Sequence, residues 1–202
     1  MAGASSGRSL LFVSSGPTVK FHCSNETTPL LTAACLAALS TFAADSTVVF
    51  NEIQYNPSPG QPEFIELRNL NGVDVNIGGW RIDSGVDFTF PAGTVVAGGS
   101  YVLVGAVPGA VGNFTGQLDN TGETVRLLNL NGRLMDEVTY SDSGDWPLGA
   151  DGSGASLSRR NASAAEGPAA WAASTTLGGT PGAANFAVIG PVTCTLIAPR
   201  AG

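Results

Sequence analysis

The tetrapeptide Asn-Leu-Asn-Gly occurs twice in this chain of 202 residues, at positions 69–72 and 129–132. Both copies are flanked by stretches in which apolar and polar residues alternate, the pattern of a half-buried β-strand. Asn-Gly is also a preferred dipeptide of tight hairpin turns, because both residues tolerate positive φ angles. The sequence therefore predicts two β-hairpins, at residues 63–82 and 123–140.

Shorter strands are predicted around these two hairpins. Apolar and aromatic residues dominate residues 47–56, 86–90, 100–106 and 155–159, and turn-forming residues separate them. The chain has 27 Gly and 12 Pro, which suits many tight turns, and no stretch shows convincing helical periodicity. About seven to nine short strands in one domain of this length predict an all-β sandwich with Greek-key connections.

A run of apolar and small residues at 30–43 precedes the first strand. Its length is typical of the core of a signal peptide and is too short to span a membrane. Residues 1–44 are therefore expected to be a leader that is cleaved near Ala43 or Ala44, and residues 1–18 resemble an over-extended start. The mature protein is expected to be secreted or held in the cell envelope or periplasm, without a transmembrane segment.

After such a leader, residues 45–185 form the predicted β-domain, and residues 186–202 are expected to be a linker or a truncated tail. Lys20 and His22 are the only lysine and the only histidine, and both precede the domain. Ser-His catalysis and histidine-ligated zinc are therefore disfavoured in the mature chain. Two of the three cysteines also fall in the leader, so Cys194 is left without an intramolecular disulfide partner and is interpreted as an incidental thiol.

The formal net charge of -7 and the pI near 4.5 describe an acidic surface. Binding of nucleic acid by electrostatic attraction is disfavoured for such a surface, because the phosphate backbone is also negative. A soluble, extracellular surface explains this balance, and the charge by itself identifies no ligand.

Three glutamates on predicted neighbouring strands, Glu52, Glu63 and Glu66, suggest a carboxylate pair for glycoside cleavage. Glutamates on the polar face of a half-buried strand are more commonly surface residues near arginines such as Arg68 or Arg81. We therefore predict that the three side chains face solvent and are not catalytic.

A candidate ligand surface lies in the long predicted loop region at residues 141–171. Trp146 and Trp171 either pack over the open end of the sandwich or form an exposed platform for a sugar or another ligand. Three aspartates accompany them in the same loop: Asp142, Asp145 and Asp151. Their oxygens could ligate Ca²⁺, but their spacing matches no ordered calcium loop, so they are interpreted as turn-forming residues.

Seven motifs follow one another in the order seen in bacterial lamin-tail domains of the secreted type: VVFNEIQYN, EFIELRNLNG, VDVNIGGWRI, FTFPAGTVVAGGSYVLV, ETVRLLNLNGRLMDEVTY, GASLSRR and TPGAAN. Residues 47–185 therefore resemble this family. The resemblance implies an immunoglobulin-like β-sandwich that serves as an accessory module of secreted proteins, often beside nucleases, phosphatases or spore-coat-like kinases. It implies no catalytic or cofactor-binding residue, because the family shares no catalytic motif.

We therefore expect a non-catalytic, exported interaction module that attaches to a protein, a polysaccharide or an envelope surface without a cofactor. The alternative is the N-terminal accessory domain of a truncated secreted hydrolase, because the residues before Gly202 resemble a linker. The nucleotide sequence downstream of the Gly202 codon would distinguish the two.

Overall fold

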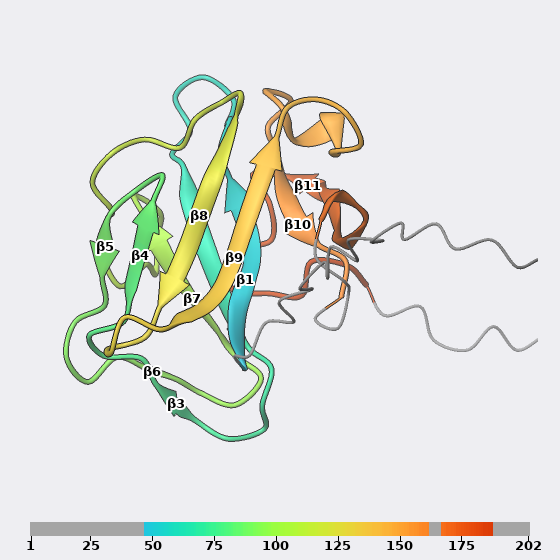
Figure 1. Cartoon of the computed structure of the whole chain (residues 1–202). Helices are drawn as coiled ribbons and strands as arrows, with labels where there is room; N and C mark the ends of the chain where they lie inside the picture. The colour runs from blue at the N-terminus through green and yellow to red at the C-terminus, as the bar shows by residue number, and fades with distance from the viewer. Residues whose placement is uncertain (1–46, 162–166, 188–202) are drawn as a thin grey trace, which may run out of the picture. The chain divides into compact units, whose positions relative to one another are not determined.

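The computed structural model describes residues 47–161 and 167–187, which form an all-β domain (Figure 1). The predicted leader at 1–44 and the residues after 187 lie outside the described ranges. Within those ranges the strands are β1 (Val48–Gln54), β2 (Phe64–Asn69), β3 (Val75–Asn76), β4 (Arg81–Ser84), β5 (Phe88–Thr89), β6 (Val95–Val96), β7 (Tyr101–Gly105), β8 (Gly122–Leu128), β9 (Leu134–Ser141), β10 (Ala155–Arg159) and β11 (Trp171–Leu177). Two 3₁₀ turns, at Leu148–Ala150 and Pro168–Ala170, are the helical elements of the same ranges. None of the described helices is long and apolar enough to cross a lipid bilayer.

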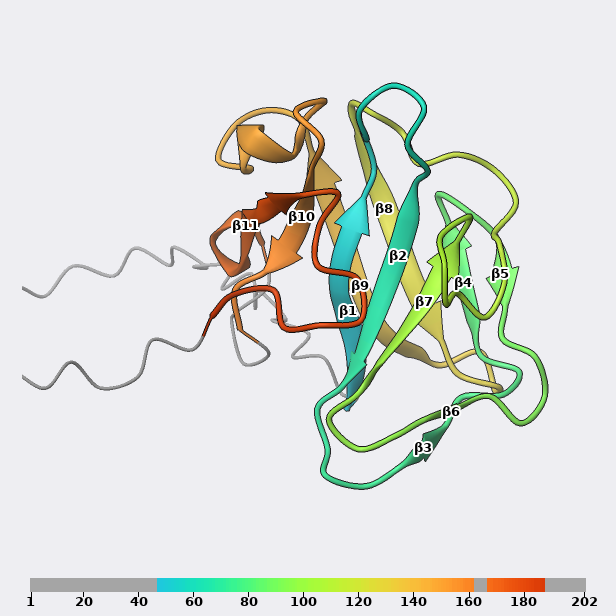
Figure 2. The ribbon, with the colours of Figure 1, turned by 180° about the vertical axis from the view of Figure 1, so that it is seen from behind.

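Two antiparallel sheets form the layers of a sandwich. One has the strand order β11-β10-β1-β2-β7 and the other the order β5-β4-β8-β9, while β3 and β6 pair separately (Figures 1 and 2). Alternate side chains of the facing strands fill the space between the layers and are almost completely buried, among them Phe50, Ile65, Val104, Leu127 and Tyr140. The predicted fold class, an immunoglobulin-like β-sandwich, is confirmed.

The predicted hairpin at residues 123–140 is also confirmed. Strands β8 and β9 pair antiparallel around the second Asn-Leu-Asn-Gly turn. The Asn129 side-chain oxygen accepts hydrogen bonds from the backbone N–H groups of Asn131 and Arg133, each at 3.0 Å, and Gly132 has a φ of 76°. Gly132 therefore has the positive φ expected of this dipeptide, whereas Asn131 does not, and the Asn129 side chain closes the turn instead.

The predicted hairpin at residues 63–82 is wrong. Strand β2 pairs with β1 and β7, whereas β3 pairs with β6. The physical reason is Asn69, whose buried amide donates to the carbonyls of Val73, Val96 and Ala97 at 2.8 to 3.2 Å. These bonds tie the turn to the chain around β6, so the residues after it cross away from β2 instead of folding back on it.

Strand β11 was not predicted, because its sequence WAASTTL consists mostly of small and polar residues without an apolar alternation. It pairs with β10 and forms one edge of the larger sheet. Residues 178–185 follow it, and we call them the C-terminal strap. In Figure 2 the strap (red) crosses the outer face of the sheet in front of β1 and β2.

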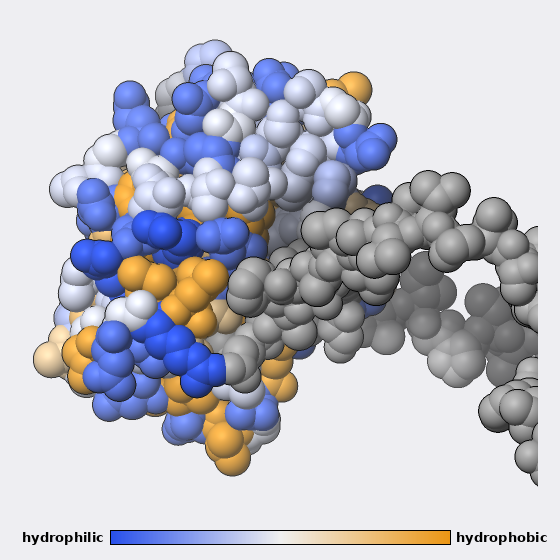
Figure 3. Space-filling view, in the orientation of Figure 1, coloured by the Kyte–Doolittle hydropathy of each residue, from blue (hydrophilic) through white to orange (hydrophobic). Residues whose placement is uncertain are grey.

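Exposed apolar side chains occur in the turns and short strands at one end of the sandwich. Figure 3 shows apolar surface among hydrophilic residues towards the end that carries β3, β6 and the β8–β9 turn. The side chains concerned include Val73, Val95 and Leu130, which are 66%, 52% and 72% exposed. These three side chains are therefore exposed apolar residues that do not belong to the buried core.

Candidate functional site

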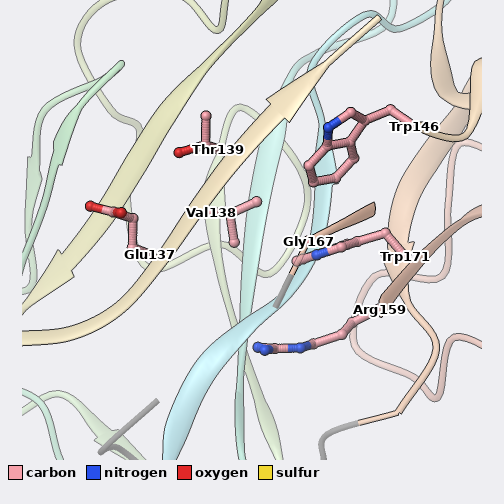
Figure 4. A pocket seen from close by; sticks show the side chains of 7 residues that line it. All are labelled: Glu137, Val138, Thr139, Trp146, Arg159, Gly167 and Trp171. Atoms are coloured by element: carbon pink, nitrogen blue, oxygen red, sulfur yellow. The ribbon is translucent and has the colours of Figure 1, made fainter. Parts of the chain in front are cut away.

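The structure brings Trp146 and Trp171 to the same hollow, which we call the tryptophan pocket (Figure 4). Its volume is about 130 Å³, and its lining consists of Glu137, Val138, Thr139, Trp146, Arg159, Gly167 and Trp171. Three separate parts of the chain supply these residues: β9, the loop after it, and the segment from β10 to β11, whose connection contains Gly167. The pocket lies where the two sheets of the sandwich meet.

The wall contributed by β9 is a strand edge. Glu137, Val138 and Thr139 are consecutive, and their side chains alternate between solvent and core, with Val138 buried and its two neighbours exposed. Successive side chains of a strand point to opposite faces of the sheet. A hollow that all three residues line therefore reaches the backbone at the edge of the strand, where the N–H and C=O groups lie. Strand β9 is the last strand of its sheet, so the pocket adjoins a sheet edge.

The two tryptophans pack against the core instead of standing free in solvent. Trp171 is 2% exposed and belongs to the core cluster, while Trp146 is partly buried against that cluster. Of the two sequence-based alternatives, packing over the open end of the sandwich fits these exposures, and an exposed platform is wrong for Trp171. Ligand binding by this pair stays a prediction.

A buried ion pair holds the inner side of the pocket. Arg159 Nη1 lies 3.2 Å from Asp136 Oδ2, and both side chains are almost completely buried. The pair fills a gap beside β1: the Phe50 N–H donates to Asp136 Oδ2 at 2.8 Å, and Arg159 Nη1 donates to the Phe50 carbonyl at 3.2 Å. Burial raises the pKa of Asp136, an effect that the guanidinium opposes. The guanidinium carbon also lies 5.7 Å from the centre of the Trp171 ring, so the ion pair fixes that indole in place.

The predicted aspartates do not line the tryptophan pocket. Asp145 and Asp151 are exposed, and Asp151 Oδ1 accepts a hydrogen bond from Asn56 Nδ2 at 2.6 Å. Asp151 and Asp142 both lie close enough to Tyr55 to help burial raise the pKa of its hydroxyl to about 12. Within residues 47–161 and 167–187, no group of three or more His, Cys, Asp or Glu side chains is arranged to hold a metal ion.

The prediction that Glu52 and Glu66 face solvent is wrong. Both residues have 0% exposure and lie opposite each other on β1 and β2. The C-terminal strap covers them: the Thr180 N–H donates to the Glu52 carboxylate at 2.9 and 3.1 Å, and the Gly182 N–H donates to Glu66 Oε2. Asn51 Nδ2 donates to Glu66 Oε1 at 2.7 Å. This burial could not be predicted from the sequence, because the strap residues that cover the two glutamates lie more than a hundred positions after them.

The buried pair is arranged for structure and not for catalysis. Ser156 and Ser158 complete the shell around Glu52, and the strap separates both carboxylates from solvent. A glycosidase needs an open cleft between its two carboxylic groups. Glu63 is half-buried outside this cluster and accepts a hydrogen bond from the Leu118 N–H at 3.0 Å.

Comparison with known proteins agrees with this architecture. The family described as Lamin Tail Domain matches residues 41–142, just over half of the chain, and it is a non-catalytic family of immunoglobulin-like domains. No curated protein matches the sequence. Strands β1 to β9 lie inside the matched region, whereas β10, β11 and the strap follow it. The chain belongs to the lamin-tail-domain family.

Proposed function

We propose that this chain is an exported, non-catalytic interaction module that binds an extended segment of a partner protein along the edge of β9. The observation that carries the proposal is the position of the tryptophan pocket beside that edge. An extended peptide adds to an edge strand through main-chain hydrogen bonds, and pockets for alternate side chains give specificity.

The size and polarity of the pocket support a peptide side chain as the occupant. Its volume of about 130 Å³ is far below the range of about 300–1,000 Å³ that is usual for small-molecule pockets. Trp146 and Trp171 offer apolar ring surface, and Asp136 already pairs with the one arginine of the lining. A single apolar side chain of a longer partner therefore fits better than an anion or a free metabolite.

Selection from a phage-displayed library of random peptides, with the full chain as bait, tests this function. We expect enriched peptides to be extended, with an apolar residue flanked by β-forming residues. Trp146→Ala should weaken the binding of such a peptide about tenfold or more, as aromatic anchors do. Leu148→Ala is the matched control, because Leu148 lies in the same loop, is 66% exposed and does not line the pocket. Equal affinity of the two variants, or a library without enrichment, would refute the proposal.

Export is the second part of the proposal, supported by the apolar run at residues 30–43. Expression of the full chain in a bacterial host, followed by mass spectrometry of the secreted or periplasmic fraction, should reveal a chain that begins at residue 44 or 45. An uncleaved protein confined to the cytoplasm would contradict it.

A further inference from the structure

The end of the C-terminal strap lies beside the tryptophan pocket. Asn185 Nδ2 donates to the Arg159 carbonyl at 2.9 Å, and Arg159 lines the pocket (Figure 4). From there the arginine side chain extends to β9, where Arg159 Nη1 lies 3.2 Å from Asp136 Oδ2. The chain that follows Asn185 therefore begins about one arginine side chain away from β9.

The predicted linker at residues 186–202 contains a segment suited to a β-strand. Residues 192–197, VTCTLI, are mostly apolar or β-branched, as strand residues commonly are, and we call them the tail segment. Residues 186–191 connect it to the strap, and an extended chain of that length spans up to about 20 Å. An extended conformation divides the tail segment between two faces, one with Val192, Cys194 and Leu196 and the other with Thr193, Thr195 and Ile197.

The tail segment and the tryptophan pocket match in polarity and in backbone geometry. The segment carries no charged residue, the pocket presents the indole rings of Trp146 and Trp171, and the Arg159 charge is already paired. Within the described residues β9 pairs with β8 alone, so its other edge can accept a further strand. A segment tethered to the same chain has an effective concentration on the order of millimolar, so even weak binding keeps it in place.

We propose that the tail segment adds to the β9 edge of its own chain and turns the face of Val192, Cys194 and Leu196 towards the tryptophan pocket. This inference rests on the proposed function, because it uses the same edge, and it names the first occupant of that edge. A partner peptide then binds by displacing the tail segment.

The test is alkylation of Cys194 by iodoacetamide in the native full chain, followed by mass spectrometry of the peptide that contains it. Cys194 shares the face that covers the pocket, so docking shields its thiol from the reagent. Trp146→Ala should speed the alkylation about tenfold or more, because loss of an aromatic anchor releases the segment. Leu148→Ala, in the same loop but outside the pocket, should leave the rate unchanged.

Two variants of the tail segment separate its release from any change in the domain. Leu196→Asn places a polar side chain on the face that covers the pocket, so it should also speed the alkylation of Cys194 about tenfold. Ile197→Asn makes the same kind of change on the opposite face and should leave the rate unchanged. Thermal melting verifies that the fold is intact in each variant.

Equal alkylation rates in Leu196→Asn and Ile197→Asn, or in Trp146→Ala and Leu148→Ala, would overturn the inference. Shielding of Cys194 that increases with protein concentration would also overturn it, because the occupant would then be the tail segment of a second copy.

Peptide binding distinguishes the failure of this inference from the failure of the proposed function. A library-selected peptide should bind Leu196→Asn more tightly than the parent chain, because the competing segment is released. Equal affinity would support the β9 edge as a partner site and exclude the tail segment as its occupant. A shielded Cys194 in a chain that enriches no peptide would support the tail segment and refute the partner site.

Discussion

Glu52 on β1 lies directly opposite Glu66 on β2, and both carboxylates are completely removed from solvent. Two acidic groups at opposed positions of neighbouring strands normally repel each other. Here hydrogen-bond donors from three places surround them: the serines of β10, Asn51 of β1, and backbone N–H groups of the strap. The pair therefore joins the sheet to the chain that follows β11.

Replacing Glu52 should test how strongly it holds this arrangement. Glu52→Ala leaves the Thr180 N–H and the hydroxyls of Ser156 and Ser158 without their acceptor. We expect the free energy of unfolding to fall by about 3 kcal/mol, because buried donors are then unpaired. Urea unfolding followed by circular dichroism measures it. The control Glu137→Ala, at an exposed position of β9, should change stability by less than about 0.5 kcal/mol. Equal stability of the two variants would contradict a structural role for Glu52.

The stability of the domain should also depend on pH through Glu66. Burial raises the pKa of Glu66 from the ordinary value of 4.5 to about 7, the Glu52 charge adds to this, and bonds from Gly182 and Asn51 oppose it. Between these pH values the folded protein binds more protons than the unfolded chain. The contribution of Glu66 is therefore fully present below pH 4.5 and is lost as pH rises through 7, by up to about 3 kcal/mol.

Urea midpoints at pH 4.5, 5.5, 6.5 and 7.5 and constant ionic strength measure this effect. Glu66→Gln, although less stable overall, should lose the part of the decline that Glu66 causes. The raised pKa values of Asp136 and Glu63 act in both proteins, so the difference between the two curves isolates Glu66. Parallel curves for parent and variant would show that Glu66 does not titrate in this range.

Asn185 should fasten the end of the strap. Its Nδ2 donates to the carbonyls of Asn51 and Arg159, each at 2.9 Å, and its Oδ1 accepts from Asn51 Nδ2 at 2.8 Å. Asn185→Ala removes all these bonds and should cost about 3 kcal/mol of stability. Hydrogen exchange at residues 178–185 should accelerate, while Ala184→Ser, at an exposed neighbouring position, should leave it unchanged. Unchanged exchange in the asparagine variant would mean that the carboxylates alone hold the strap.

The sequence predicted the parts of this molecule that local patterns determine. Alternation identified β1, β8 and β9, and the short strand β10 was predicted at its observed bounds. The sequence patterns could not predict β11, because its small residues show no apolar periodicity. They could not predict the burial of Glu52 either, because it depends on Thr180, which is 128 positions away in the sequence. The tryptophans of the candidate site stood out by residue type, whereas Arg159 of the same pocket did not. An arginine within an apparently half-exposed strand has no local signature of burial.

The two Asn-Leu-Asn-Gly turns have the same sequence but different backbone conformations, so substitution of their glycines should affect stability differently. Gly132 has a φ of 76°, which a β-branched residue adopts only under strain, so Gly132→Val should destabilise the domain by about 1 kcal/mol or more. Gly72 does not have a positive φ, and a Cβ added there would meet no heavy atom within 4 Å. Gly72→Val should therefore change stability by less than about 0.5 kcal/mol. Thermal and urea unfolding of the two variants side by side would measure both effects. Equal losses would contradict the assignment of an ordinary φ and open space to Gly72.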